Sequence, residues 1–330
     1  MIFLESTSHD PYYNLALEQY VFDYLPKDQS YFMLWQNDNS LIVGKFQNTV
    51  AEINAAYVQE HGIRVARRLS GGGAVYHDMG NLNYTFITDA GNMEDLNLHA
   101  FCVPLVNALR RLGVNAEVTG RNDVTIDGQK CSGNSQYIKH GRVMHHGCIL
   151  FDANLSVVAG ALNVPKDKIE SKGVKSVRSR MTNIRPHLKE DIDMAQFKEV
   201  LKQYMVTDAA LEPYTLTEQD KAQIQKMRDE QYSTWDWNFG ASPEYSIQKA
   251  RRVEGCGRIE VTMEVGKGGV ITAFSCHGDY FGNGDTSDLA KLLVGTPLEE
   301  NALRARLADF PLEEYISKLD KEEFIRILLQ

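Results

Sequence analysis

The residues of this chain best suited to chemistry are three consecutive glycines preceded by two arginines; residues 67–78 read RRLSGGGAVYHD. Consecutive glycines let the backbone adopt positive φ angles and remove every Cβ that would hold a ligand away from the main chain. Their amide groups can converge on an anion, and the guanidinium groups of Arg67 and Arg68 add positive charge and paired donors. The flanking segments are β-prone, so the sequence predicts a sheet-anchored loop that binds a carboxylate or a phosphate. A flexible turn without a ligand is the alternative.

The glycine run does not match the commoner phosphate-binding motifs. A P-loop places Lys and Ser or Thr directly after its last glycine, whereas this chain has Ala74 and Val75 there. A dinucleotide-binding fingerprint has spaced glycines that open a helix, whereas β-prone residues follow here. The run is therefore not one of the commoner phosphate-binding motifs.

Two further residues could contribute charge to such a site. Lys130 opens the segment KCSGNS, in which small residues leave room for a ligand beside a strand, and Asp123 lies in the segment RNDV. A magnesium ion that bridges nucleotide phosphates usually takes only one or two protein carboxylates, so Asp123 is a candidate ligand. From the residues alone, a solvated lysine at a strand end and an Asn-Asp turn are the alternatives.

Two pairs of basic residues follow later in the chain. His145 and His146 cannot easily bind one metal ion, because adjacent residues of a strand point to opposite faces. We interpret His146 as facing a pocket and His145 as structural. Arg178 and Arg180 lie in a glycine- and serine-containing segment and are candidates for a local basic pocket. A solvated basic loop is the alternative interpretation of this segment.

The five cysteines include no C-x-x-C pair, which predicts a reducing, cytosolic environment rather than a disulfide framework or a zinc site. Cys148 begins the apolar segment CILF and is predicted to be a small hydrophobic residue of the core. Cys131, next to Lys130, is predicted to be the more accessible thiol.

Length and charge narrow the class of protein. A chain of 330 residues suggests two domains, and a formal net charge of −9 argues against nonspecific nucleic-acid binding. No apolar stretch approaches the roughly 20 residues of a membrane span, and the first residues do not read as a secretory signal. We therefore expect a cytoplasmic protein that binds neither nucleic acid nor membrane.

The hydrophobic pattern predicts an α/β domain at residues 1–245. After Asp10-Pro11, apolar residues recur at helical spacing, which is typical of an amphipathic helix. Further helices are predicted at about 50–61, 96–112, 155–162, 194–204 and 217–231, and strands at 31–35, 41–43, 64–67, 74–76, 81–87, 124–126, 129–138 and 143–151.

A second domain is predicted at residues 246–330, beyond an aromatic cluster and the linker GASP at 240–243. It is a small α+β module. Its predicted strands lie at 245–253, 258–265 and 270–276, and its helices at about 286–293, 299–308, 312–319 and 321–329.

In several blocks the chain resembles the lipoate-protein ligase family. These blocks follow one another in the family's order: NLALE at 14–18, WQNDNSLIVGKFQN at 35–48, the glycine run, RNDV at 121–124, KCSG at 130–133, HHG at 145–147 and the segment 172–183. The resemblance implies the α/β (α+β) fold shared by lipoate ligases, biotin ligases and octanoyltransferases, with a mixed sheet, flanking helices and a C-terminal accessory domain.

The resemblance also implies a site for ATP, Mg²⁺ and lipoate. In the family, the lysine that matches Lys130 bridges the carboxyl oxygen of the acid and the α-phosphate, and Asp123 matches the metal ligand. The residues implied to bind ATP or lipoate are Arg68, Ser70, Gly71, Gly72, Gly73, Ala74, Val75, Tyr76, Asn83, Asp123, Lys130, His146, Arg178 and Arg180.

The implied activity is ATP-dependent lipoylation of proteins. Lipoate would be activated to lipoyl-AMP with release of pyrophosphate and then transferred to a lysine of a lipoyl domain, in 2-oxoacid dehydrogenase complexes and the glycine cleavage H protein. Two alternatives remain: a cysteine-dependent octanoyl or lipoyl transferase, which would need Cys148, and a noncatalytic lipoate sensor, which would release no pyrophosphate. We expect the C-terminal module to contact neither ATP nor lipoate and to rotate during the cycle.

Overall fold

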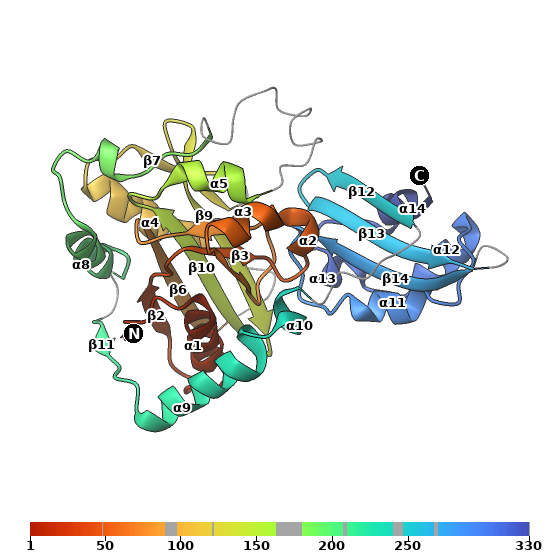
Figure 1. Cartoon of the computed structure of the whole chain (residues 1–330), viewed down its shortest axis with the longest axis horizontal. Helices are drawn as coiled ribbons and strands as arrows, with labels where there is room; N and C mark the ends of the chain where they lie inside the picture. Colours follow the sequence, from red (N-terminus) through yellow and green to blue (C-terminus); the bar gives the residue numbers. More distant parts are fainter. Residues whose placement is uncertain are drawn as a thin grey trace. The chain divides into compact units, whose positions relative to one another are not determined.

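The computed structural model describes residues 1–47, 49–89, 98–120, 122–162, 180–206, 210–239, 247–266 and 270–329. They form two compact units (Figure 1). The first unit comprises Met1–Ile42, Glu52–Arg67 and Val75–Asn238, and the second comprises Val43–Ala51, Arg68–Ala74 and Phe239–Gln330. Arg178 and the predicted linker at 240–243 lie outside the described residues.

An eight-stranded sheet forms the centre of the first unit, with the strand order β11-β1-β2-β6-β10-β9-β8-β7. Its strands are β1 (Ile2–Glu5), β2 (Tyr31–Trp35), β6 (Asn81–Asp89), β7 (Ala116–Thr119), β8 (Asp123–Ile126), β9 (Gln129–Lys139), β10 (Arg142–Leu150) and β11 (Glu212–Pro213). β1 runs parallel to β2 and β11, whereas β2, β6, β10, β9, β8 and β7 pair antiparallel. The predicted mixed sheet is confirmed.

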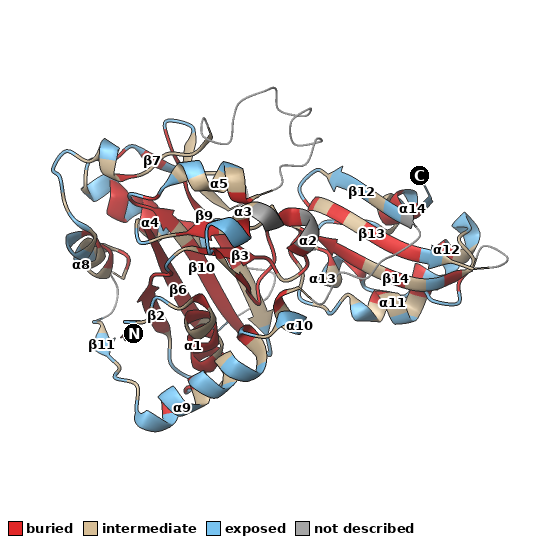
Figure 2. Ribbon diagram, viewed as in Figure 1, coloured by how far each residue is buried: buried red, intermediate tan, exposed pale blue. Residues whose placement is uncertain are grey.

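Helices cover both faces of this sheet. On one face, α4 (Leu98–Arg111) and α8 (Met194–Tyr204) pack on a core of buried aliphatic and aromatic side chains. On the other face lies α1 (Pro11–Asp23), whose Glu18 accepts a hydrogen bond from the Thr85 hydroxyl of β6. Because both faces are covered, β2 and most of β6 and β10 are buried along their length (Figure 2).

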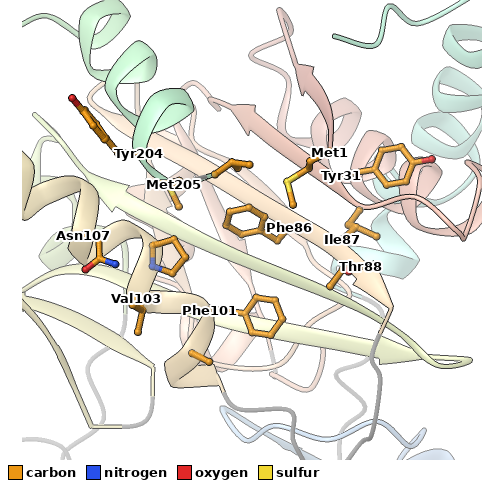
Figure 3. Close-up of a pocket in the computed structure, with 13 residues that line it drawn as sticks. Met1, Tyr31, Phe86, Ile87, Thr88, Phe101, Val103, Asn107, Tyr204 and Met205 are labelled. Atoms are coloured by element: carbon orange, nitrogen blue, oxygen red, sulfur yellow. The ribbon is translucent and has the colours of Figure 1, made fainter. Parts of the chain in front are cut away.

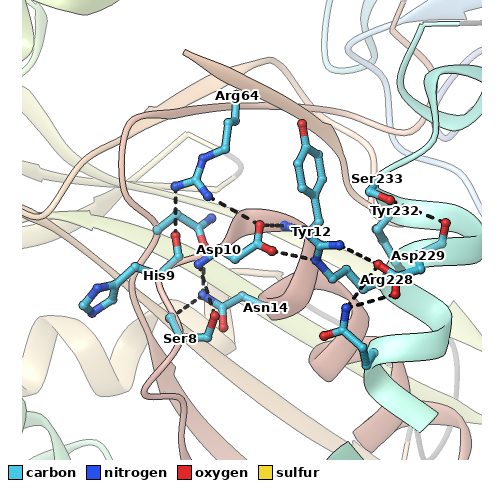
Figure 4. A network of polar contacts seen from close by, with 12 residues as sticks. Ser8, His9, Asp10, Tyr12, Asn14, Arg64, Arg228, Asp229, Tyr232 and Ser233 are labelled. Atoms are coloured by element: carbon cyan, nitrogen blue, oxygen red, sulfur yellow. Dashed lines mark hydrogen bonds and ion pairs between the residues drawn. The ribbon is translucent and has the colours of Figure 1, made fainter. Parts of the chain in front are cut away.

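A polar network fixes the start of α1 (Figure 4). Asp10 caps the helix by accepting a hydrogen bond from the Tyr12 amide at 3.1 Å. Its carboxylate also accepts a 2.7 Å bond from Nε of Arg228 and lies 3.5 Å from the Arg64 guanidinium. A carboxylate is favourable at a helix N-terminus, where the unpaired amides carry partial positive charge. The network thereby ties α1 to β4 (Arg64–Arg67) and to the π-helical turn Arg228–Tyr232.

A small sheet of the order β4-β3-β5 carries the glycine loop. β3 (Ser40–Val43) is the central strand, between β4 and β5 (Val75–His77). The segment that joins β4 to β5 contains the glycine run and therefore passes the end of β3. The remaining helices of the first unit are α3 (Ala55–Glu60), α5 (Leu155–Ala161), a 3-10 turn (Arg185–His187), α9 (Glu218–Met227) and α10 (Trp235–Asn238).

The second unit has its own sheet and core. β12 (Ile247–Val253), β13 (Gly257–Val265) and β14 (Ile271–Gly278) form an antiparallel meander. Its helices are α2 (Thr49–Glu52, of which Glu52 is grouped with the first unit), α11 (Ser287–Leu293), α12 (Glu300–Leu307), α13 (Leu312–Tyr315) and α14 (Lys321–Leu329). Phe46, far away in sequence, is part of this core.

Most elements lie where the hydrophobic pattern predicted them, and the main differences are as follows. The single helix expected at 50–61 is wrong: Asn54 interrupts it and caps α3 by accepting a hydrogen bond from the Tyr57 amide. β1, β7, β11 and α10 were not predicted, because none of them has a pronounced alternating or helical pattern of apolar residues. The helix expected at 312–319 ends at Tyr315, and Lys318 has a positive φ of 63°.

Candidate functional site

A row of residues crosses the large sheet on the face covered by α1. Trp35 pairs with Asn83, Asn83 with Cys148, Cys148 with Gly133, and Gly133 with Asp123. Residues paired in this way on adjacent strands lie on the same face of a sheet. The row thus brings Asn83 and Asp123, which are 40 positions apart in sequence, onto one surface of the first unit.

Lys130 reaches this surface through an irregularity in the sheet. The register of β8 and β9 shifts between Val124 and Thr125, where Lys130 pairs. Such a bulge changes the direction in which a side chain points. The Lys130 ammonium lies 2.7 Å from Oδ1 of Asp123. A Cβ on Gly133 would lie 2.8 Å from the same nitrogen, so the missing side chain makes room for the lysine.

The ion pair is accessible, because the side chains of Lys130 and Asp123 each keep 36% of their surface exposed. Among the described residues, no three His, Cys, Asp or Glu side chains cluster to hold a metal ion. Asp123 nevertheless fits Mg²⁺ as a single carboxylate, since this ion typically binds one or two carboxylates together with water and substrate phosphates.

Asn83 offers a donor on the same face of the sheet, three strands along the row from Asp123. Asn83 is buried, and its side-chain oxygen accepts a hydrogen bond from Asn81 at 3.1 Å. Its Nδ2 has no hydrogen-bond partner among the described residues. A buried amide without a partner costs free energy unless a ligand or water satisfies it. Nδ2 of Asn83 can therefore donate a hydrogen bond to a bound molecule.

A buried chain of hydrogen bonds links residues of β2, β6 and β10 on the same face to Glu18 of α1. Nε1 of Trp35 donates to the Thr85 hydroxyl at 2.9 Å, and this hydroxyl donates to Glu18 at 2.5 Å. Nδ1 of His146 lies 3.0 and 3.2 Å from the two oxygens of Glu18. These contacts fix the orientation of the His146 ring against the Glu18 carboxylate. Sequence reasoning missed the role of Glu18, although a glutamate on an apolar helix face was a usable signal.

The two histidines lie on opposite faces of β10. His145 has no exposed surface, and its ring stacks on Phe101 of α4 at 4.9 Å. Burial, and to a smaller extent the neighbouring His146, lowers the pKa of His145 to about 3. His145 is therefore neutral at physiological pH.

The two arginines before the glycine run have different surroundings. In the first unit, Arg67 donates to the carbonyl oxygens of Trp237 and Asn238, and burial lowers its pKa to about 10. In the second unit, Arg68 donates through Nε to the Ser70 hydroxyl at 3.1 Å. Arg67 thus holds α10 in place, whereas Arg68 belongs to the loop.

The glycine loop, defined here as residues 68–74, is internally organised. Nη2 of Arg68 donates to the carbonyl oxygens of Gly71 and Gly73 at 2.7 and 2.9 Å. Gly72 has a φ of 93°, a conformation that residues with a side chain rarely adopt. A Cβ on Gly73 would meet nothing within 4 Å, so this side of the loop is open. Within the loop, Ser70 is buried and Ala74 is half-buried.

Three other predicted residues lie in the first unit. Val75 is half-buried, whereas Tyr76 is buried and its hydroxyl donates to Asn39 at 3.0 Å. Arg180 is half-buried and precedes Met181, which forms a β-bridge with Lys130. Arg180 is thus adjacent in sequence to the residue that pairs with Lys130.

Two predictions about cysteines are wrong. Cys131 has no exposed surface, and burial raises its pKa to about 12. Cys148 is only half-buried and lies in the cross-sheet row beside Asn83. The physical reason is the bulge in β9, which turns Cys131 into the core under α4, whereas alternation along β10 leaves Cys148 on the opposite face.

A cavity of about 430 Å³ also opens in the first unit (Figure 3). It lies between α4, the ends of β2 and β6, and the end of α8, and is lined mainly by apolar side chains such as Phe86, Phe101 and Met205. None of its lining residues is a predicted site residue. No helix among the described residues is long and apolar enough to span a membrane.

Comparison with known proteins agrees with this architecture. The family model of the lipoyl protein ligase A/B catalytic domain matches residues 10–206, and that of the bacterial lipoate protein ligase C-terminus matches residues 242–328. The chain is 42% identical to lipoate-protein ligase LplJ of Bacillus subtilis, over 99% of this chain and all of the relative.

Two solved structures share the fold. Plasmodium falciparum LipL1 in complex with lipoate is 22% identical, with a TM-score of 0.80 over 100% of this chain and 99% of that one. A lipoate-protein ligase A bound with ATP is 24% identical, with a TM-score of 0.63 over 73% of this chain and 98% of that one. The predicted fold class, a ligase-like α/β domain with a C-terminal accessory domain, is confirmed.

The mixed sheet, the glycine loop and the C-terminal module together define a two-part α/β enzyme. The chain belongs to the lipoate-protein ligase family.

Proposed function

We propose that this protein is an ATP-dependent lipoate–protein ligase that works through lipoyl-adenylate. One observation carries the proposal: the Lys130 ammonium lies 2.7 Å from Asp123 on an accessible surface, in a chain whose full-length relative LplJ is a lipoate-protein ligase. A carboxylate and a triphosphate repel each other, and a fixed ammonium between them offsets this repulsion.

In the first half-reaction, a lipoate carboxylate oxygen attacks the α-phosphorus of ATP. The bond between the α- and β-phosphates breaks, and pyrophosphate leaves. Lys130 stabilises the charge that grows on the oxygens, while the glycine loop holds the phosphates through its amides. Mg²⁺, when bound at Asp123, would neutralise phosphate charge. The cross-sheet row and the Glu18–His146 pair border the acid.

In the second half-reaction, the ε-amine of a lysine on a lipoyl domain attacks the acyl carbon of the mixed anhydride. The bond between the acyl carbon and the phosphate oxygen breaks, and AMP leaves. Activation has already given the acyl group a good leaving group, so no nucleophile of the enzyme is needed. We propose the lipoyl domains of 2-oxoacid dehydrogenase complexes and the glycine cleavage H protein as acceptors. The cytosolic location and the roles of Arg178 and Arg180 stay predictions.

A cysteine-dependent acyltransferase is the second candidate, and one observation favours it. Cys148 is half-buried and lies on the same face as Asn83 and Asp123. A thiol in that position could accept an acyl group, whereas the sequence had suggested a core residue.

Pyrophosphate release separates the candidates. The purified protein is mixed with ATP, Mg²⁺ and free lipoate, with and without a lipoyl domain, and pyrophosphate is measured by a coupled assay. A ligase releases pyrophosphate only when lipoate is present and modifies the lipoyl domain. A transferase or a sensor releases none, and either result would refute the proposal.

A further inference from the structure

The glycine loop rests on the turn that follows β14. Within the second unit, the Gly72 amide donates to the Tyr280 carbonyl at 3.4 Å. A Cβ on Gly71 would lie 2.3 Å from this same carbonyl oxygen and 3.3 Å from Cα of Phe281. The two main chains therefore touch at a distance that only glycine permits.

The side chain of Phe281 extends this contact. Its ring lies 3.6 to 3.7 Å from the position of a Cβ on Gly72, and the residue keeps only 9% of its surface exposed. We call Tyr280 and Phe281 together the loop seat.

The loop seat is itself held firmly by the module. Tyr280 has no exposed surface, its ring stacks on Phe46 at 4.9 Å, and its hydroxyl donates to the Cys276 carbonyl at 3.2 Å. The Phe281 carbonyl accepts a 2.7 Å hydrogen bond from the Ser317 amide. A backbone fixed in this way is a rigid support for whatever packs on it.

A loop with three consecutive glycines needs such a support. Glycine loses more conformational freedom on ordering than any other residue, so a free loop would have to be ordered each time a ligand binds. A loop that is already held in one conformation avoids that cost. The hydrogen bonds from Arg68 organise the loop from inside, and the loop seat holds it from outside.

We infer that Tyr280 and Phe281 are positioning residues for the activation half-reaction: they hold the glycine loop in one conformation before ATP and lipoate bind. The inference rests on the proposed function. The C-terminal module was expected to contact neither ATP nor lipoate. According to this inference, the module nevertheless affects the activation step, because it holds the glycine loop.

The test compares two truncations of phenylalanine in the full-length protein. Phe281→Ala removes the ring beside Gly72. Phe274→Ala is the matched control, because Phe274 is a similarly buried residue of β14 that packs edge-on against Phe324 of α14. Where either variant fails to fold, the Phe281→Leu and Phe274→Leu pair replaces it.

Both half-reactions and the loop itself are measured. Phe281→Ala should lower the rate of lipoate-dependent pyrophosphate release about 10- to 100-fold, since a misplacement of about 1 Å can cost that much. Transfer from saturating, supplied lipoyl-adenylate to a lipoyl domain should change far less. Hydrogen exchange of peptides covering residues 68–75 should become faster in Phe281→Ala and stay as in wild type in Phe274→Ala.

A second pair of variants tests the contact from the side of the loop. Gly71→Ala must push the loop away from the Tyr280 carbonyl, so exchange at residues 68–75 should become faster. Gly73→Ala adds a methyl group that meets nothing within 4 Å and serves as the control for exchange only.

Several results would overturn the inference: unchanged or faster pyrophosphate release in Phe281→Ala, equal loss in both half-reactions, or unchanged exchange of the loop. If wild-type protein releases no pyrophosphate, the proposed function fails instead, and the exchange experiment still decides whether the loop seat orders the loop.

Discussion

Replacement of Lys130 by alanine tests the centre of the proposed chemistry. The ammonium lies 2.7 Å from Asp123, and the space left by Gly133 lets it cross the sheet surface. Removal of one group that stabilises developing charge typically costs about 100- to 1000-fold in rate. We expect Lys130→Ala to reduce lipoate-dependent pyrophosphate release by this factor.

The same substitution should leave the fold intact. Lys130 and Asp123 are each 36% exposed, and an ion pair as exposed as this contributes only about 0–1 kcal/mol to stability. The Lys130 side chain is partly exposed, so its truncation leaves no closed apolar cavity. The free energy of unfolding, measured in urea, should therefore stay within about 1 kcal/mol of wild type.

Lys139→Ala is the matched control, because Lys139 is an exposed residue at the far end of the same strand, β9. Pyrophosphate release is followed at saturating ATP with lipoate varied, so that effects on binding and on the chemical step are separated. Near-normal turnover in a folded Lys130→Ala protein would remove this lysine from the mechanism. Equal losses in the two lysine variants would point to a general charge effect instead.

Three further predictions concern the surrounding residues. Cys148→Ala should keep lipoylation of a lipoyl domain within a few fold, and loss of activity in a folded protein would favour the transferase. Glu18→Gln should lower stability by about 1.5–3 kcal/mol, because it weakens buried hydrogen bonds of a carboxylate to Thr85 and His146; an unchanged urea midpoint would contradict this. The pKa of His145 falls from its ordinary 6.5 to about 3 in the folded protein. Below pH 6.5 the unfolded chain therefore takes up a proton that the native chain does not, and stability falls by up to about 1.4 kcal/mol per pH unit. His145→Leu should make the decline between pH 6.5 and 5 shallower, and equal slopes in urea titrations would show that another group causes it.

Local patterns in the sequence determined the chemistry that this protein can perform. The glycine run, the lysine before Cys-Ser-Gly and the aspartate before a strand are each defined by a few adjacent residues, so their types and spacing are readable without a structure. The strands that carry Asn83 and Asp123 were predicted for the same reason, since alternation and β-prone residues are local properties.

Only the tertiary structure decided which residues share a surface. The row from Trp35 to Asp123 depends on the pairing of strands far apart in sequence, and Cys148 joins that row because of register. A bulge in β9 sends Lys130 to this surface and Cys131 into the core, and no local pattern marks a bulge of this kind.

The sequence likewise could not predict which segment of the chain packs against the glycine loop. Gly71 and Gly72 are separated from Tyr280 by about 200 residues, yet their main chains touch. A glycine at position 71 indicates that other atoms approach the main chain closely there. Only the packing of distant segments determines that the close neighbour is the Tyr280 carbonyl of the C-terminal module.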